Sequence, residues 1–147
     1  MSLHTAALSR EPAALAHAGI AAFPPGSAAM AERGVLDTTL AMRHAGIRRL
    51  RIGWELQGAQ DAQDAPVIVV QGGISAHRHV AAGARFAEPG WWDAQCGEGR
   101  AIDTRPHRVL AIDWIGADGS LDACIDPSDQ ADAIAAVLDH LGIVRVT

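Results

Sequence analysis

Hydroxyl, imidazole and guanidinium side chains stand within a few positions of one another in the segment Gln71–His79 (QGGISAHRH). Ser75 and His77 could form a nucleophile and its base, but no aspartate stands nearby to orient the imidazole. His77 and His79 could ligate a metal ion, yet two nitrogens do not complete a site, and no cysteine or acid has suitable local spacing. We therefore expect no metal and no serine nucleophile in this segment, and we expect His77 and Arg78 either to line or support a cleft or to solvate a loop.

The remaining reactive side chains give weaker signals. Cys96 and Cys124 lie in Gly- or Asp-rich loops without a basic partner, so we expect reduced, non-catalytic thiols in a cytoplasmic protein. The acidic stretch 118–132 does not match the spacing of a calcium-binding loop and indicates a solvated face. Asp113 follows an apolar run, at the kind of strand end where α/β proteins bind ligands. It could instead accept hydrogen bonds in a turn, and the sequence leaves both roles open.

Short apolar runs predict the strands that would position these side chains. Val67–Val70 and Val109–Ile112 are continuous apolar runs, typical of strands that are buried on both faces in a parallel sheet. Earlier in the chain, Thr38–His44 and Arg49–Leu56 flank an Ala-Gly pair, which predicts an antiparallel hairpin.

A helix and a further strand are expected near the end of the sequence. The helix should start near Asp129, with Asp126 or Ser128 as its N-cap and Gly142 as its C-cap. The residues after it, Ile143–Thr147, predict a third strand of the sheet. The expected apolar face of the helix consists of Ala131, Ile134, Ala135, Leu138 and Leu141.

The composition is that of one folded domain. The chain has 147 residues, of which 49% are hydrophobic and 20% charged, and its formal net charge is −5. No window approaches the roughly 18 apolar residues of a membrane span, and no basic start precedes an apolar block as in a secretory signal. The folded part offers no basic face for nucleic acid. We expect residues 1–34 to be a variable, poorly structured leader and residues 35–147 to form the domain.

Motifs of one enzyme family recur along the chain. The stretch GWWD at 90–93, followed by GEGRAIDT at 97–104, is similar to that family's GWWD…GPGKxxDT stretch and is the most specific match. Four other stretches match strands and loops of the family: RIGWELQG at 51–58, VIVVQGGISA at 67–76, VLAIDWIG at 109–116, and residues 130–146. Over about residues 38–147 the chain resembles the homoserine O-acyltransferases, acetyl- and succinyltransferases of the α/β-hydrolase superfamily.

This resemblance implies a fold and a set of site residues. The fold would be the N-terminal part of an α/β-hydrolase, incomplete, with a mostly parallel sheet and an antiparallel N-terminal hairpin. A backbone N–H of Gly72, Gly73 or Ile74 would stabilise the oxyanion of an acyl-transfer intermediate. Trp91 and Trp92 would either line an acyl or pantetheine tunnel or pin a long loop to the core.

The resemblance also implies a reaction. An acyl group would pass from acyl-CoA to the side-chain hydroxyl of homoserine, or of a related hydroxy amino acid, through an acyl-serine, in methionine biosynthesis. Acyl-CoA is the co-substrate there, and no cofactor is bound permanently. The 147 residues contain no Gly-x-Ser-x-Gly, so the catalytic triad is absent, and family members are more than twice as long. We therefore expect an N-terminal portion that is inactive alone and that would be completed as a homodimeric enzyme or by a complementing C-terminal chain.

Of three alternatives to this resemblance, the first is disfavoured, the second stays open and the third fails. A fragment of another α/β-hydrolase, such as an esterase, would not be expected to carry the GWWD…DT stretch. A non-catalytic module that binds a small molecule would keep the substrate loop and lack catalysis. A dinucleotide-binding unit fails because the G-x-G-x-x-G register is absent after Val67–Val70.

Overall fold

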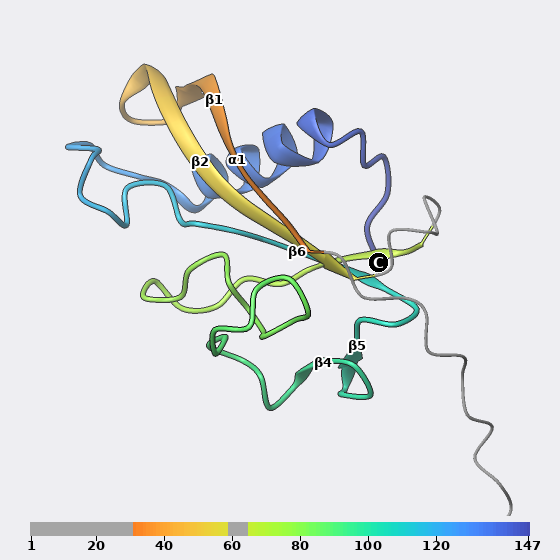
Figure 1. The fold of residues 1–147 in the computed structure, drawn as a ribbon. Coiled ribbons are helices and arrows are strands. Elements are labelled where there is room, and N and C mark those ends of the chain that lie inside the picture. Colours follow the sequence, from red (N-terminus) through yellow and green to blue (C-terminus); the bar gives the residue numbers. More distant parts are fainter. Residues whose placement is uncertain (1–30, 59–64) are drawn as a thin grey trace, which may run out of the picture.

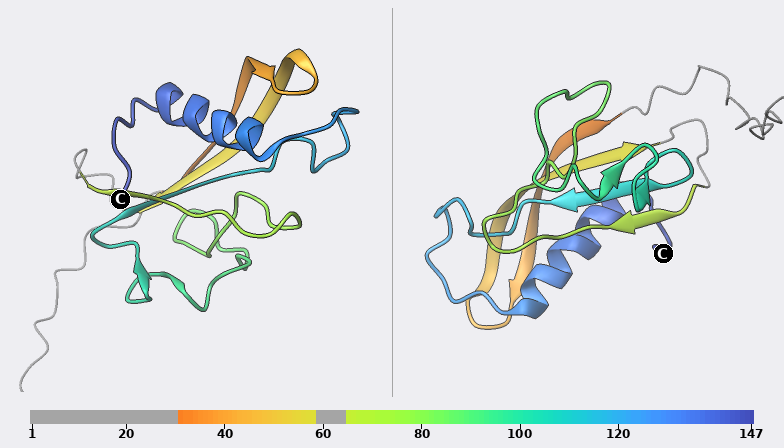
Figure 2. Two further views of the ribbon diagram at one scale, coloured as in Figure 1. Left: turned by 180° about the vertical axis from the view of Figure 1, so that it is seen from behind. Right: turned by 90° about the horizontal axis from the view of Figure 1, so that it is seen from below.

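The computed structural model describes residues 31–58 and 65–147. The main sheet lies between two layers: a helix covers one side, and most of the long segment between its last two strands covers the other (Figure 1, Figure 2). The expected leader falls almost entirely outside the described residues, and the first strand begins at Glu32. In chain order the elements are β1 (Glu32–Met42), β2 (Gly46–Gly58), β3 (Val67–Val69), β4 (Cys96–Gly97), β5 (Ile102–Asp103), β6 (Arg108–Ile112) and α1 (Pro127–His140).

The main sheet has the strand order β1-β2-β6-β3. β1 and β2 form an antiparallel hairpin in which Met42 lies opposite Gly46, and Gly46 has a φ of +67°, which suits glycine at a tight turn. β6 pairs antiparallel with β2 and parallel with β3, so the described part of the sheet is mixed. The predicted hairpin and both predicted apolar strands are therefore confirmed, and the hairpin strands are longer than the sequence indicated. The turn lies at residues 43–45, so His44, expected in the first strand, is in the turn, and Gly46 begins β2.

The strand expected at residues 143–147 is only begun. Val146 forms an isolated parallel bridge with Val67, and the N–H of Thr147 donates to the Val67 carbonyl at 2.8 Å. Val144 is fully exposed. These contacts place the segment beside β3, on the side of that strand away from β6.

The two faces of β2 carry different chemistry because successive side chains of a strand point to opposite sides. Ile52, Trp54 and Leu56 pack with α1 in one apolar core. Gly53, Glu55 and Gln57, which alternate with these apolar residues, face the long segment that follows β3. The second core, on that face, includes Val70, Val80, Ala81, Cys96, Val109 and Ala111.

A capping box fixes the start of α1 and ties it to the hairpin. The N-cap is Asp126, one of the two residues predicted, and its side chain accepts from the N–H of Ser128 at 2.9 Å. The carboxylate of Asp129, only 2% exposed, accepts from the N–H of Asp126 and from the N–H of Arg43 in the hairpin turn, each at 2.8 Å. A cap of this kind stabilises a helix by about 1 kcal/mol. The C-cap is Leu141 and not Gly142 as predicted; Gly142 is the next residue, with a φ of +66°, the left-handed conformation common just after a helix.

The predicted apolar face of α1 is partly wrong. Ala133 and Val137 are fully buried against the sheet, and Ile134, Leu138 and Leu141 pack beside them, whereas Ala131 and Ala135 are exposed. Alanines occur on several sides of this helix, so their spacing does not single out one face. The larger Val137, with Ala133 one turn earlier, decides which side is buried.

Candidate functional site

A groove of about 840 Å³ opens at the edge of the sheet where β3 and β6 end. Ligands of open α/β sheets bind beyond the carboxyl ends of parallel strands, so the groove lies at the position where this architecture binds small molecules. Its walls come from the first half of β2, from the turn after β3 and from the segment after β6. Its polar lining residues are Arg49, Arg51, Ser75, His77, Arg78, Asp113, Asp118 and Ser120.

A tight turn after β3 forms one wall of this groove. The N–H of Ala76 donates to the Gly73 carbonyl at 2.8 Å and closes the turn. A Cβ on Gly72 would lie 2.5 Å from the Ala76 Cβ, whereas a Cβ on Gly73 would meet nothing within 4 Å. Ile74 is 73% exposed at the tip. Within the described residues, the N–H groups of Gly72, Gly73 and Ile74 donate to no protein group, which leaves them available to a ligand.

Two indole groups anchor this turn. The Nε1 of Trp114 donates to the carbonyls of Gly72 and Gly73, at 3.2 and 3.1 Å. The Nε1 of Trp91 donates to the His77 carbonyl at 2.7 Å. The ring of Trp91 also packs against Gly72, where an added Cβ would lie 2.9 Å from it. The turn is therefore held from two sides by side chains that come from distant parts of the sequence.

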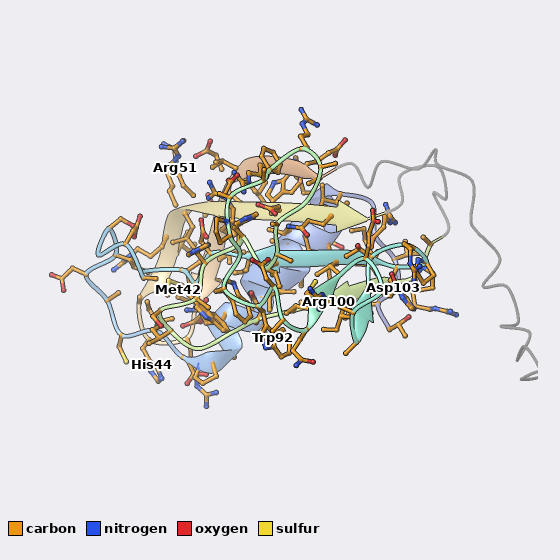
Figure 3. All side chains as sticks on the ribbon, turned by 60° about the horizontal axis from the view of Figure 1, so that its bottom comes forward. Met42, His44, Arg51, Trp92, Arg100 and Asp103 are labelled. Carbon is orange, nitrogen blue, oxygen red and sulfur yellow. The ribbon has the colours of Figure 1, made fainter. Side chains whose placement is uncertain are left out.

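The adjacent tryptophans have different surroundings. Trp92 stacks on Trp91, with ring centroids 5.6 Å apart, and is 39% exposed. In Figure 3, Trp92 is seen on the long segment and Arg51 on the hairpin. Neither tryptophan is among the residues that line the groove. Of the two roles left open for them, the contacts of Trp91 match the pinning of a loop.

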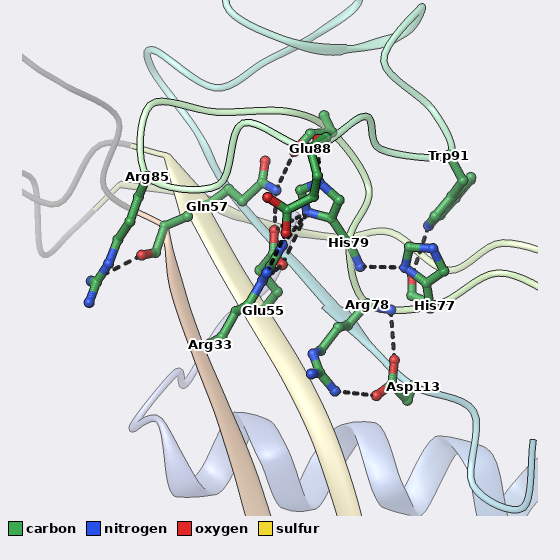
Figure 4. A network of polar contacts seen from close by, with 12 residues as sticks. Arg33, Glu55, Gln57, His77, Arg78, His79, Arg85, Glu88, Trp91 and Asp113 are labelled. Carbon is green, nitrogen blue, oxygen red and sulfur yellow. Dashed lines mark hydrogen bonds and ion pairs between the residues drawn. The ribbon is translucent and has the colours of Figure 1, made fainter. Parts of the chain in front are cut away.

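Arg78 and Asp113 form an ion pair on the same wall of the groove. The Asp113 carboxylate accepts from the backbone N–H of Arg78 at 2.8 Å and from its guanidinium (Figure 4). The pair packs directly on β2, where a Cβ on Gly53 would lie 2.2 Å from the Arg78 Nη1 and 2.3 Å from the Asp113 Oδ2. Gly53 therefore makes room for the pair. His77, Arg78 and Asp113, all expected at a cleft, come together at this groove.

Behind the turn lies a buried network of charged side chains centred on Glu55 (Figure 4). Its carboxylate, fully buried, accepts from the Nε of Arg33 and from the side-chain amide of Gln57, and lies 2.9 Å from the Nδ1 of His79. The Nε2 of His79 contacts the Glu88 carbonyl at 2.8 Å, and the guanidinium of Arg33 pairs with the Glu88 carboxylate. The network thus joins β1 and β2 to the segment 79–88.

The protonation of His79 depends on this network. Burial disfavours the charged imidazole, and so does the positive charge of Arg33, whose Nη2 lies 2.8 Å from the His79 Nδ1. The hydrogen bonds with the Glu88 carbonyl and the Glu55 carboxylate outweigh both and raise the pKa of His79 above its ordinary 6.5. In the protonated form both ring nitrogens donate, one to the carboxylate and one to the carbonyl.

Other reactive groups do not gather at the groove. Burial raises the pKa of the Cys96 thiol to about 11, so it stays protonated at neutral pH, and Cys124 is an exposed free thiol. Asp93 accepts from the N–H groups of Ala82 and Gly90 and caps that loop. In residues 31–58 and 65–147, no three His, Cys, Asp or Glu side chains lie close enough to hold a metal ion. No helix in the same residues is long and apolar enough to cross a membrane.

Two functional elements were missed from the sequence. The Glu55 network was not predicted, although the polar residues Glu55 and Gln57 alternate with the apolar residues of a strand, which is a visible signal. That alternation usually indicates a face exposed to water, and here the long segment covers it. Trp114 stands inside a recognised motif, but nothing in the sequence pointed to its contact with Gly72 and Gly73.

Comparison with known proteins shows which enzymes this chain is similar to. No family model matches the chain. It is 60% identical, over 116 residues, to the homoserine O-succinyltransferase of Xanthomonas campestris pv. campestris strain ATCC 33913. The resemblance to the homoserine O-acyltransferases is confirmed. That match covers 79% of this chain but 31% of the relative, so the chain spans about a third of the length of the curated relatives it matches.

Further relatives of this acyltransferase-like chain agree with that assignment. A serine O-succinyltransferase from Xanthomonas campestris pv. campestris strain B100 is 33% identical over 129 residues, which are 76% of this chain and 34% of the relative. The crystal structure of a homoserine O-acetyltransferase from Bacillus anthracis superimposes with a TM-score of 0.61 at 23% identity, covering 80% of this chain and 38% of that one. An esterase structure gives a TM-score of 0.63 at 23% identity over 80% of this chain and 39% of its own. These structures show the α/β-hydrolase fold, part of which this chain forms.

Proposed function

We propose that this chain provides the oxyanion-binding part of a homoserine O-acyltransferase that uses succinyl-CoA. The observation that carries the proposal is the turn after β3, whose N–H groups at Gly73 and Ile74 have no partner among the described residues. Ile74 lines the groove, and Gly73 directly precedes it. The 60% identity to a homoserine O-succinyltransferase supports the choice of acyl donor and acceptor.

The proposed reaction has two acyl transfers. A serine hydroxyl attacks the thioester carbonyl, the C–S bond breaks, and the sulfur leaves as the CoA thiol with the proton that a histidine took from the serine. The homoserine hydroxyl then attacks the carbonyl of the acyl-serine and gives its proton to the histidine. The bond between the acyl carbon and the serine oxygen breaks, and the histidine returns the proton to that oxygen, which restores the serine hydroxyl. Each attack places negative charge on the carbonyl oxygen, and N–H donors already held in position stabilise that charge. Since the chain contains no Gly-x-Ser-x-Gly, the serine belongs to a part of the enzyme outside these residues.

A chimera tests this proposal. In the Xanthomonas campestris homoserine O-succinyltransferase, the matched 116-residue segment is replaced by the corresponding segment of this chain. We expect turnover with succinyl-CoA and homoserine, measured as release of the CoA thiol. Acetyl-CoA and serine, each in place of one substrate, measure the preference for donor and acceptor. A chimera that folds with a single thermal transition but has no turnover would refute the proposal.

The chain by itself is expected to give no turnover with acetyl-CoA or succinyl-CoA plus homoserine. Its completion, by a second polypeptide or within a homodimeric enzyme, stays a prediction, as does its location in the cytoplasm. Mixing this chain with a polypeptide that carries the remaining part of the relative tests completion in trans, with size-exclusion chromatography as the readout of assembly.

A further inference from the structure

Two consecutive carbonyls of the turn after β3 accept hydrogen bonds from one donor. The Trp114 Nε1 lies 3.2 Å from the Gly72 oxygen and 3.1 Å from the Gly73 oxygen. No peptide bond in the described residues is cis, and in a trans peptide the C=O and the following N–H point in opposite directions. The N–H groups of Gly73 and Ile74 therefore both point away from the Trp114 indole.

Successive N–H groups that share one side of the backbone form a concave anion-binding nest. A Cβ on Gly73 would meet nothing within 4 Å, and Ile74 is 73% exposed, so the side of the turn that carries these N–H groups is open among the described residues. The N–H of Gly72 shares its peptide group with the carbonyl of Gln71, and the Trp114 indole donates to the carbonyls of Gly72 and Gly73 instead. Of three candidate donors, the geometry favours Gly73 and Ile74.

Trp114 is itself fixed to the sheet. The preceding residue, Asp113, donates its N–H to the Gly53 carbonyl at 2.8 Å and so extends the pairing of β2 with β6. The Asp113 carboxylate also binds Arg78, which follows the turn on its C-terminal side. The position of the indole, and through it the position of Gly72 and Gly73, is therefore set by the end of β6.

We propose that Trp114 is a positioning residue, which aims the N–H groups of Gly73 and Ile74 at the oxyanion of the acyl-transfer intermediate. The inference rests on the proposed function and adds to it the residue that orders the donors. Trp114 acts through the two carbonyls of the turn and need not touch the acyl group.

The first test uses the chain as it is, in solution NMR. In the unmodified chain the indole N–H of Trp114 should exchange with solvent more slowly than that of Trp92, whose indole donates no hydrogen bond within the described residues. Trp114→Phe keeps an aromatic ring and removes the donor. We expect the amide order parameters of Gly73 and Ile74 to fall from about 0.85 to below about 0.6 in this variant and to stay unchanged in the matched control Trp92→Phe. Equal exchange of the two indole protons, or unchanged order parameters, would overturn the inference.

The second test uses the chimera and separates the inference from the function on which it rests. Because misplaced donors weaken binding of the transition state and not of the substrate, Trp114→Phe should lower kcat by about 10- to 100-fold with KM unchanged. Trp92→Phe should leave both constants unchanged. An active chimera whose kcat survives Trp114→Phe overturns the positioning role. A chimera without turnover refutes the proposed function instead, and the NMR result then decides alone whether Trp114 orders the turn.

Discussion

Replacing Glu55 by glutamine tests whether the buried network holds the long segment on the sheet. The Glu55 side chain is fully buried, and its oxygens face the Arg33 guanidinium, the Gln57 amide and the His79 imidazole. Glutamine has nearly the same volume but carries no negative charge, and its NH2 group would face donors. Removing one partner of a buried ion pair costs about 3–5 kcal/mol. Arg33 keeps its pair with Glu88, so we expect a loss near the lower end, about 3 kcal/mol.

Urea-induced unfolding measures this loss through the denaturation midpoint, followed by far-UV circular dichroism and tryptophan fluorescence. The matched control is Glu88→Gln, since the Glu88 side chain is 50% exposed and contributes a partly solvated pair to the same arginine. We expect the control to shift the midpoint much less, because exposed ion pairs contribute little. Equal shifts for the two variants, or a more stable Glu55→Gln, would mean that the carboxylate at the centre of the network does not stabilise the fold.

Three further predictions follow from single groups. Because the folded-state pKa of His79 is raised, the contribution of His79 to stability should be complete below about pH 6.5 and should be lost as the pH rises through the higher folded-state value. Urea midpoints measured across that range should fall with rising pH, and His79→Gln should remove this dependence. Gly72→Ala should lower the melting temperature, because the added Cβ would clash with Ala76 at a cost of about 1–3 kcal/mol, while Gly73→Ala should leave it nearly unchanged. Equal melting temperatures of the two variants would contradict the described turn. A thiol reagent at neutral pH should modify Cys124 only, and Cys96 only after urea is added; rapid modification of both in the folded chain would show that Cys96 is not buried.

The parts of the fold that were predictable from the sequence are those encoded locally. The hairpin, the two apolar strands and the capped helix each show their pattern within about a dozen residues, and all four were predicted. Which face of the helix is buried was predicted only in part, because alanines lie on several sides of the helix and only packing against β1 and β2 separates them.

The candidate site was predictable only in part, for a physical reason. The turn after β3 follows from Gly72 and Gly73 at the end of a strand, but the groups that hold it come from far along the chain. Trp114 bonds with a carbonyl 42 residues earlier, and Glu55 bonds with Arg33 and His79, which are 22 and 24 residues away. Such pairings depend on strand order and register, which no local pattern determines.

The strand β2 explains how a small sheet can carry both a core and a site. Its residues Ile52, Trp54 and Leu56 bury apolar surface against α1, and this burial is the non-directional part of its stability. On the opposite face, Gly53 leaves space for the Arg78–Asp113 pair, and the carboxylate of Glu55 binds the arginine and histidine that hold the segment 79–88. The hydrogen bonds and ion pairs on this second face are directional, so they fix the long segment at one position over the sheet. Trp91 belongs to that long segment, and its indole N–H donates to the carbonyl of His77. The alternation of side chains along β2 therefore helps to set the position of the turn where the N–H groups of Gly73 and Ile74 lie.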